Sequence, residues 1–205
     1  MTNQKPSPEH YFSEHPESEA RRGLIQACLR NVQFEFLTAS SVFSKRRIDK
    51  GTRLLIEAMI LPNSGCVLDL GCGYGAVGIA AATFNPALQV KMTDVNSRAV
   101  NLARKNVDRN KVANAEVRCG CLYAPVKDLT FNCILSNPPV SAGMTTVKAI
   151  ITEAPKVMAE KARLQMVVRS KIGGGILPPV FEDTFGNCKV IARESGYRVL
   201  MAEKE

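Results

Sequence analysis

Two acids flank a glycine-rich segment of this chain. Residues 67–78 read VLDLGCGYGAVG, so that Asp69 lies in an apolar run just before the glycines. Glycines after such a run let the backbone turn sharply off a strand and let a ligand lie against it. Asp94 ends the next apolar run, roughly 20 residues after Gly73, which is the offset expected of a carboxylate that binds a ribose hydroxyl pair. The pattern predicts a nucleoside pocket.

The position of Asp69 separates two classes of cofactor. Gly73, Gly75 and Gly78 match the G-x-G-x-x-G pattern of dinucleotide-binding turns. A pyrophosphate is poorly placed beside the negative charge of Asp69, whereas a cationic group, such as the amino group of S-adenosylmethionine, suits a carboxylate. The sequence therefore favours S-adenosylmethionine, and a nicotinamide cofactor stays open as the alternative.

An asparagine and two prolines follow a later apolar run, in the segment ILSNPPV at residues 134–140. Pro138 restricts Asn137 to an extended conformation, and Pro139 stiffens the loop further. The Asn137 side-chain oxygen and a proline carbonyl could accept the two hydrogens of an exocyclic amine. Held in this way, the nitrogen lone pair would point at a sulfonium methyl, with no strong base needed before transfer. We predict Asn137, Pro138 and Pro139 as catalytic residues.

A sheet is needed to bring these residues together. From Pro62 onward, apolar runs alternate with helical patterns, which predicts an α/β, Rossmann-like fold with an open, mostly parallel, seven-stranded sheet and helices on both faces. Only residues 193–196 join the last two strands, so these strands are expected to be antiparallel, because a parallel return takes about a dozen residues. Strands are expected at 66–70, 88–94, 115–119, 131–135, 164–168, 188–192 and 197–201. One helix is expected to run from the glycine turn to residue 82, and a second to begin with Ser97 as its N-terminal cap. A third is expected over 146–161, with a break at Pro155.

The chain before Pro62 has a different pattern. We predict that residues 1–61 form an N-terminal extension that packs on a core domain of residues 62–205 and helps to close its pocket. The extension is expected to contain a helix over 13–29, a strand over 31–37, a basic loop over 45–50 and a helix over 52–61.

The composition excludes several classes of protein. With 45% hydrophobic and 22% charged residues among 205, the chain is neither disordered nor collagen-like. Its 27 Lys and Arg against 19 Asp and Glu give a net charge of +8, which suits a polyanionic partner such as nucleic acid. The seven cysteines include no C-x-x-C pair, which predicts reduced thiols and no metal site. No apolar run has the length of a signal peptide core or a membrane span, so we expect a cytoplasmic protein with no membrane partner.

These motifs resemble a known family. V-L-D-L-G-C-G-Y-G and the T-D-V-N of residues 93–96 resemble the first two motifs of class I S-adenosylmethionine-dependent methyltransferases. The Asn-Pro-Pro sequence followed by Val140 and Gly143 resembles the form found in the methyltransferase small domain family, which includes small-subunit ribosomal RNA guanine-N2 methyltransferases. The likeness continues in H-Y-F-S at 10–13, G-T-R-L-L-I-E at 51–57, V-V-R-S-K at 167–171 and E-S-G-Y at 194–197.

The resemblance implies a set of cofactor-binding residues. Asp69 and the glycine backbone would hold the methionine part, Asp94 the ribose, and Thr52 would close the methionine end. Cys121 stands where relatives tend to carry an Asp, so the adenine contacts there would be backbone or apolar. The implied set is Thr52, Asp69, Gly71, Cys72, Gly73, Asp94, Val95, Cys121, Leu122 and Asn137.

On the substrate side, the aromatic residue that often follows the two prolines is replaced by Val140. A stacking partner for a flipped base would then come from Phe12, Phe43 or Tyr74. Basic side chains are expected at the mouth of the pocket if the substrate is RNA, because phosphate contacts provide much of the affinity. The predicted substrate-binding set is Phe12, Phe43, Arg46, Arg47, Val140, Arg169 and Lys171.

Together, these features predict an S-adenosylmethionine-dependent N-methyltransferase, with guanine N2 of small-subunit ribosomal RNA as the favoured target and RNA or a small-subunit particle as the partner. The same tetrapeptide suits any planar amide or arylamine, so N5-glutamine and adenine-N6 methyltransferases stay open. A non-catalytic RNA-binding module of the same fold is the alternative from outside the enzyme class.

Overall fold

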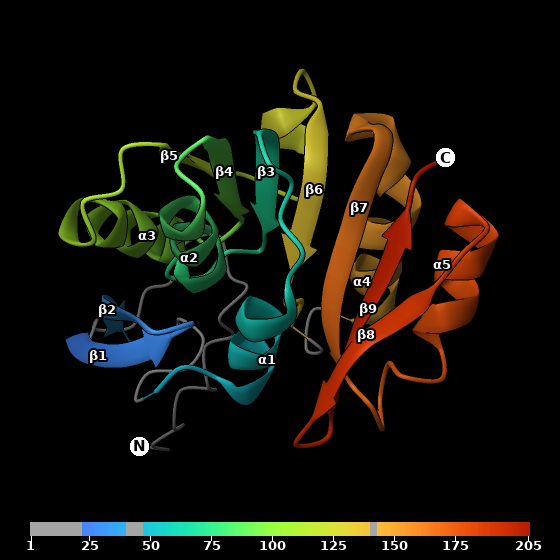
Figure 1. Cartoon of the computed structure of the whole chain (residues 1–205), viewed down its shortest axis with the longest axis horizontal. Helices are drawn as coiled ribbons and strands as arrows, with labels where there is room; N and C mark the ends of the chain where they lie inside the picture. Colours follow the sequence, from blue (N-terminus) through green and yellow to red (C-terminus); the bar gives the residue numbers. More distant parts are fainter. Residues whose placement is uncertain (1–21, 40–46, 140–142) are drawn as a thin grey trace, which may run out of the picture.

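The computed structural model describes residues 22–39, 47–139 and 143–205 of the chain (Figure 1). Its strands are β1 (Arg22–Leu29), β2 (Val32–Ala39), β3 (Gly65–Leu70), β4 (Leu88–Asp94), β5 (Ala115–Cys119), β6 (Phe131–Ser136), β7 (Met158–Arg169), β8 (Lys189–Glu194) and β9 (Tyr197–Glu203). Its helices are α1 (Lys50–Ala58), α2 (Ala76–Phe84), α3 (Ser97–Arg109), α4 (Met144–Glu153) and α5 (Leu177–Phe185), with short 3-10 turns η1 (Ala124–Val126) and η3 (Ala154–Val157). No helix in these three segments is long and apolar enough to cross a bilayer.

Seven strands form the main sheet, in the order β5-β4-β3-β6-β7-β9-β8. The first five of these are parallel, and β9 pairs antiparallel with both β7 and β8. This confirms the predicted Rossmann-like sheet, including the antiparallel pair at the C-terminus. Because the five parallel strands run in one direction, their carboxyl ends meet at a single edge, where Asp94, Ser136 and Arg169 end β4, β6 and β7.

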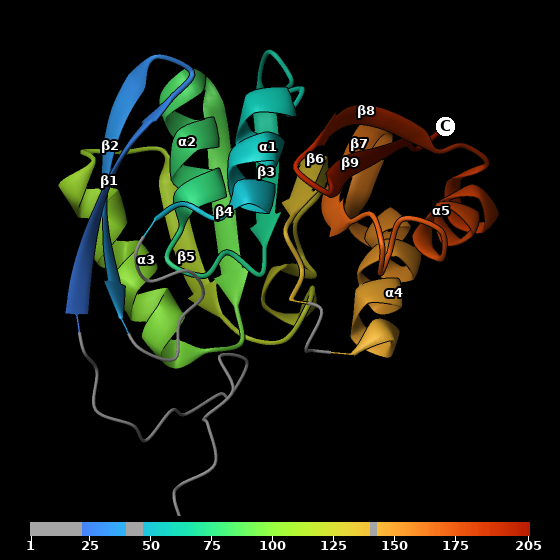
Figure 2. The same ribbon diagram turned by 90° about the horizontal axis from the view of Figure 1, so that it is seen from below.

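The sheet separates two apolar cores. Val67 and Leu68 are neighbours on β3 yet belong to different cores, because successive side chains of a strand point to opposite faces. One core lies under α1, α2, α3 and the β1–β2 hairpin, and the other lies under α4 and α5. Figures 1 and 2 show α1 and α2 on one side of the sheet and α4 and α5 on the other.

The expected helix over residues 13–29 is wrong for its described part, because β1 spans Arg22–Leu29 and pairs with β2. Ile25, Ala27 and Leu29 are buried while Leu24 and Cys28 are exposed, which is the two-residue period of a strand. The side chains at positions 24 and 28 are apolar although they are exposed, and together with the buried ones they gave the spacing expected of a helix face. Arg30 and Asn31 join the strands with φ angles of 44° and 63°, the positive values that a tight hairpin turn requires.

Other elements also differ from the sequence-based expectation, and the helix expected over 52–61 spans Lys50–Ala58 as α1. The helix expected to reach residue 161 ends at Glu153, and β7 begins at Met158, because the chain turns through η3 at Pro155. Asn96, not Ser97, caps α3, with its side chain accepting from two backbone N–H groups. Helix α5 was not predicted; its two prolines lie in the first turn, where a missing N–H costs little.

Side-chain amides attach the β1–β2 hairpin to the core. Asn106 and Asn110 lie one turn apart on α3, and their amides bond to the backbone of Leu37 and Glu35 as a neighbouring strand would. The Asn106 Nδ2 also donates to the backbone oxygen of Tyr74, in the glycine turn, at 2.8 Å. Figure 2 shows the hairpin outside the main sheet, on the side of α2 and α3. The hairpin therefore supports the segment in which the cofactor motif lies.

Candidate active site

A cavity of about 640 Å³ opens at the carboxyl ends of the parallel strands. This is the edge at which open α/β sheets bind ligands. The predicted site residues that line it are Thr52, Asp69, Gly71, Cys72, Gly73, Asp94, Val95, Cys121, Leu122, Asn137, Pro138, Pro139 and Arg169. Three further lining residues, Asp49, Thr93 and Tyr197, were not in the predicted set of site residues, although the resemblance places the segment that ends at Asp49 near the cofactor.

The glycine turn offers bare backbone to the cavity. Gly71 and Gly73 have φ angles of 75° and 57°, and a Cβ atom added to either would meet nothing within 4 Å. The Gly71 and Cys72 N–H groups both donate to the Thr93 carbonyl at 2.9 Å, which fixes the turn to the end of β4. A ligand can therefore lie directly on a backbone whose position is already set.

Asp94 holds this turn from the neighbouring strand. Its Oδ2 accepts from the Gly73 N–H at 2.8 Å, and its Oδ1 accepts from the Asn96 N–H at 2.9 Å. Burial raises the pKa of Asp94, and the backbone N–H donors counteract that effect. Because each carboxylate oxygen has two lone pairs, both can accept a further hydrogen bond from a ligand hydroxyl. The geometry fits the ribose-binding role predicted for this residue.

Asp69 lies deeper, with only 1% of its surface exposed. Its Oδ2 accepts from the Gly78 N–H in α2 at 2.8 Å. Burial raises the pKa of Asp69 to about 7; the Gly78 N–H opposes this effect and the nearby Asp94 charge adds to it. A buried carboxylate with so high a pKa is suited to a cationic ligand group, which would restore its negative charge. The two acids and the open glycine backbone together fit S-adenosylmethionine.

We expect Asp69 to make the protein less stable as the pH rises from about 4 to about 7. In that range the unfolded chain has lost this proton, while the folded chain retains it, so the free energy of unfolding falls with pH. The full loss is on the order of 4 kcal/mol, at about 1.4 kcal/mol per pKa unit. Asp69→Asn, which can still accept from Gly78, should flatten this part of the profile. Urea unfolding of both proteins at about pH 5 and pH 8 measures the difference; parallel profiles would contradict it.

The side-chain amide of Asn137 has a fixed direction. Its Nδ2 donates to the Thr52 hydroxyl oxygen at 2.9 Å and faces the Asp49 Oδ2 at 3.3 Å. A carboxylate only accepts hydrogen bonds, so the NH2 group and not the oxygen of the amide faces Asp49. No described residue donates to the Asn137 Oδ1, which is thus left as a free acceptor in the cavity wall.

The opposite end of the cavity is formed by the loop after β5. The Gly120 N–H donates to the Asp94 carbonyl at 3.0 Å, which holds this loop beside the second acid. Cys121 and Leu122 follow, and Leu122 has a φ of 47°. The Cys72 thiol is buried nearby, and burial, together with the charges of Asp94 and Asp69, raises its pKa well above its usual value. Cys72 is therefore a neutral part of the wall, not a nucleophile.

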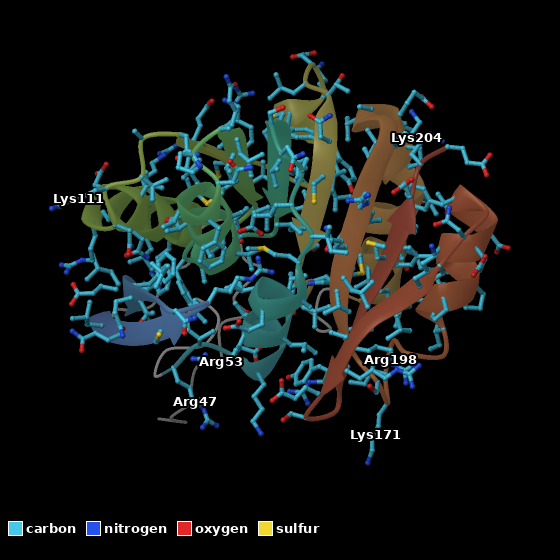
Figure 3. The ribbon with its side chains drawn as sticks, in the orientation of Figure 1. Arg47, Arg53, Lys111, Lys171, Arg198 and Lys204 are labelled. Carbon is cyan, nitrogen blue, oxygen red and sulfur yellow. The ribbon has the colours of Figure 1, made fainter. Side chains whose placement is uncertain are left out.

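Basic side chains gather at the same edge of the molecule. Figure 3 shows Arg47, Arg53, Lys171 and Arg198 at the end where β3, β6 and β7 finish, with Lys111 and Lys204 away from it. Arg169 lines the cavity, and its guanidinium lies 5.4 Å from the centre of the Tyr197 ring.

Among the aromatic residues predicted to stack on a base, only Tyr74 lies in the described part of the chain. Tyr74 borders the cavity, but it is only 3% exposed, and its ring packs on Phe36 in the core. Phe12, Phe43, Arg46 and Val140 lie outside the described residues. Within the described segments, no three His, Cys, Asp or Glu side chains are grouped so that they could hold a metal ion.

The sheet order, with a glycine turn, a second acid and an Asn-Pro-Pro loop around one cavity, defines a Rossmann-like fold with a candidate site for methyl transfer. The model of the methyltransferase small domain family matches residues 33–201, and the chain belongs to this family of S-adenosylmethionine-dependent methyltransferases.

Two relatives show how the match extends along the chain. An uncharacterized protein of Bacillus subtilis, YbxB, is 35% identical over 96% of this chain and 98% of its own length. A ribosomal RNA small subunit methyltransferase C of Hamiltonella defensa is 32% identical over 91% of this chain but only 53% of its own. The chain thus spans about half the length of the curated relatives that carry a functional name.

Solved structures confirm the fold. T. thermophilus RsmC, a 16S rRNA N2 methyltransferase in complex with AdoMet and guanosine, gives a TM-score of 0.81 at 23% identity, covering 93% of this chain and 52% of that one. A ribosomal protein L11 methylase of Lactobacillus delbrueckii gives 0.59 at 21% identity, covering 76% and 78%. Because the fold serves both kinds of enzyme, the substrate has to be inferred from the site.

Proposed function

We propose that this methyltransferase acts on the exocyclic amine N2 of guanine in small-subunit ribosomal RNA. The direction of the Asn137 amide carries the transfer to an exocyclic amine, and the names of the relatives support guanine in small-subunit ribosomal RNA as the target. Its NH2 group is engaged by Thr52 and Asp49, so its Oδ1 is free to accept a hydrogen from an amine. A planar amine held in this way presents its lone pair along one line, which is the requirement for in-line transfer.

S-adenosylmethionine supplies an electrophilic methyl group on its sulfonium. In our proposal, the methionine part is surrounded by Thr52, Asp69, Gly71, Cys72 and Gly73. The ribose is bound by Asp94 and Val95, and the adenine lies against Cys121 and Leu122. Asp94 has unused lone pairs for the ribose hydroxyls, and Gly71 and Gly73 leave room for the cofactor against the backbone.

The transfer itself needs orientation more than it needs a base. The amine nitrogen forms a bond to the methyl carbon as the carbon–sulfur bond breaks, and the nitrogen then releases one proton to solvent. Asn137 Oδ1 and the Pro138 carbonyl accept the two amine hydrogens, while Pro139 keeps the loop stiff. Fixed acceptors of this kind stabilise the partial positive charge that develops on the nitrogen.

Three observations support RNA as the partner. The net charge is +8, basic residues lie on the edge that carries the cavity, and relatives at about 30% identity are named for small-subunit ribosomal RNA. We propose that phosphates or bases are contacted by Arg47, Arg169 and Lys171. The same role is proposed for Phe12, Phe43, Arg46 and Val140, which lie outside the described residues. We also propose that the protein is cytoplasmic and that its substrate is a ribosomal particle. The same proposal divides the chain into an N-terminal extension of residues 1–61 and a core domain of residues 62–205.

The test is incubation with labelled S-adenosylmethionine and either naked ribosomal RNA, small-subunit particles or protein extract. Nucleoside and amino-acid analysis of the labelled product should give N2-methylguanosine. Labelled N6-methyladenosine or N5-methylglutamine would overturn the guanine assignment. The Asn137→Ala protein, run in parallel, shows whether the label depends on this site and not on a contaminating enzyme.

A further inference from the structure

Asp49 has one carboxylate oxygen that its structural role leaves unused. As the N-terminal cap of α1, it accepts through Oδ2 from the backbone N–H groups of Gly51 and Thr52, at 2.9 and 3.1 Å. The same oxygen faces the Asn137 Nδ2 at 3.3 Å. No described residue donates to Oδ1, although Asp49 lines the cavity. Capping and amide orientation therefore use only half of this carboxylate.

Two free acceptors thus belong to adjacent side chains in the cavity wall: Asp49 Oδ1 and Asn137 Oδ1. On the Watson–Crick edge of guanine, the N1–H and N2–H donors are also adjacent. Adenine and the glutamine amide likewise carry an NH2 group, but each places an acceptor beside it, at N1 or at the amide oxygen. A carboxylate facing that acceptor would be repelled, whereas one facing guanine N1–H would form a charge-assisted hydrogen bond.

We infer that Asp49 is the residue that selects guanine, by accepting a hydrogen bond from N1–H while Asn137 holds N2. Asn137 alone does not distinguish among amines, because all three substrates offer it the same NH2 group. Selection by Asp49 combines an attraction for guanine with a repulsion of its competitors. The inference rests on the proposed methyl transfer to an exocyclic amine.

Asp49 borders residues outside the glycine turn as well as Thr52. A Cβ atom on Gly51, two residues along, would lie 2.9 Å from the Tyr197 ring, and Arg169 lies over that ring. Gly51, Arg169 and Tyr197 belong to α1, β7 and β9, whereas Asp69 and Asp94 of the cofactor motif lie at the carboxyl ends of β3 and β4. Asp69 is available as the acid for the methionine amino group, so Asp49 is not required there.

Asp49→Asn isolates the unused oxygen. Asparagine caps helices about as well as aspartate, so its oxygen can keep the bonds from Gly51, Thr52 and Asn137. That geometry places an NH2 group where Oδ1 was, and a donor then faces guanine N1–H. The variant should lose on the order of 100-fold in N2-methylguanosine formation, the range of one bidentate base contact. Adenine should lose less, because its N1 can accept from the new NH2 group.

The experiment measures methylation of RNA oligonucleotides whose only purine is guanine, adenine or 2-aminopurine, together with small-subunit particles. 2-Aminopurine keeps the 2-amino group but has an acceptor at N1. The wild type should prefer guanine to 2-aminopurine, and Asp49→Asn should abolish or reverse this preference while the calorimetric affinity for S-adenosylmethionine stays the same. Asp183→Asn, on the exposed surface of α5, is the charge-matched control and should behave as the wild type.

Each failure has its own signature. If the wild type methylates guanine and Asp49→Asn keeps the same guanine preference, the role of Asp49 is wrong. If the variant instead loses cofactor affinity, Asp49 contacts the methionine amino group and the inference also fails. If the wild type methylates no RNA guanine at all, the proposed function fails first. Thermal unfolding of both variants checks that α1 remains folded.

Discussion

Asn137→Ala binds S-adenosylmethionine as the wild type does but transfers its methyl group on the order of 1,000-fold more slowly. The substitution removes Oδ1, the acceptor that orients the amine, and the loss of one preorganised hydrogen-bonding group at a reacting centre typically costs 100- to 1,000-fold in rate. The cofactor motif, at β3 and β4, is not changed. Calorimetric titration gives the affinity, and single-turnover methylation of the RNA substrate gives the rate.

Asn137→Asp is the matched comparison. It keeps an acceptor oxygen but places a second carboxylate next to Asp49, whose Oδ2 faces the native amide nitrogen at 3.3 Å. Two carboxylates so close do not both ionise readily, so the activity of this variant should depend on pH more steeply than that of the wild type. A turnover equal to the wild type in Asn137→Ala would refute the amine-orienting role.

Asp94→Ala should show the opposite result, a loss of cofactor affinity on the order of 100-fold or more. The native carboxylate accepts from Gly73 and Asn96, so its removal leaves two backbone N–H groups without their acceptor. The glycine turn is loosened at the same time as the ribose contact is lost. Calorimetry with S-adenosylmethionine and with S-adenosylhomocysteine measures the change.

Asp94→Asn separates the two contributions of this residue. Its single amide oxygen can accept from only one of the two backbone groups, and its NH2 group would face the other, so the affinity should fall but less than in the alanine variant. NAD serves as the negative control ligand. Tight binding of NAD by the wild type, with no response to S-adenosylmethionine, would disprove the cofactor assignment.

The sequence predicted the main sheet and most of the cavity lining for a simple physical reason. A parallel sheet brings the carboxyl ends of its strands to one edge, so acids and an asparagine that follow apolar runs must meet there. Strand order did not have to be known in detail. Asp69, Asp94 and Asn137 could thus be placed around one cavity because they lie at or just beyond the carboxyl ends of β3, β4 and β6.

Contacts that depend on packing could not be predicted. Asp49 and Asn137 are separated by 88 positions in the chain, and no local pattern shows that α1 begins against the loop after β6. Strand β1 was mistaken for a helix because Leu24 and Cys28 are apolar yet exposed, so that its two-residue period was hidden. No element was predicted for the segment of α5, and the structure shows that Pro178 and Pro179 occupy the first turn of this helix.

Helix α2 has an energetic consequence for ligand binding. All its residues from Ala76 to Ala82 are buried, and it packs against β3, β4, α1 and α3, so it cannot shift without disturbing the core. The turn that precedes it is fixed at its other end by β3. Because both ends of the turn are immobile before the cofactor arrives, little conformational entropy is lost when it binds. A larger share of the free energy of the contacts then contributes to the binding affinity. Both the cofactor and its product should bind to a glycine turn that already has its bound conformation.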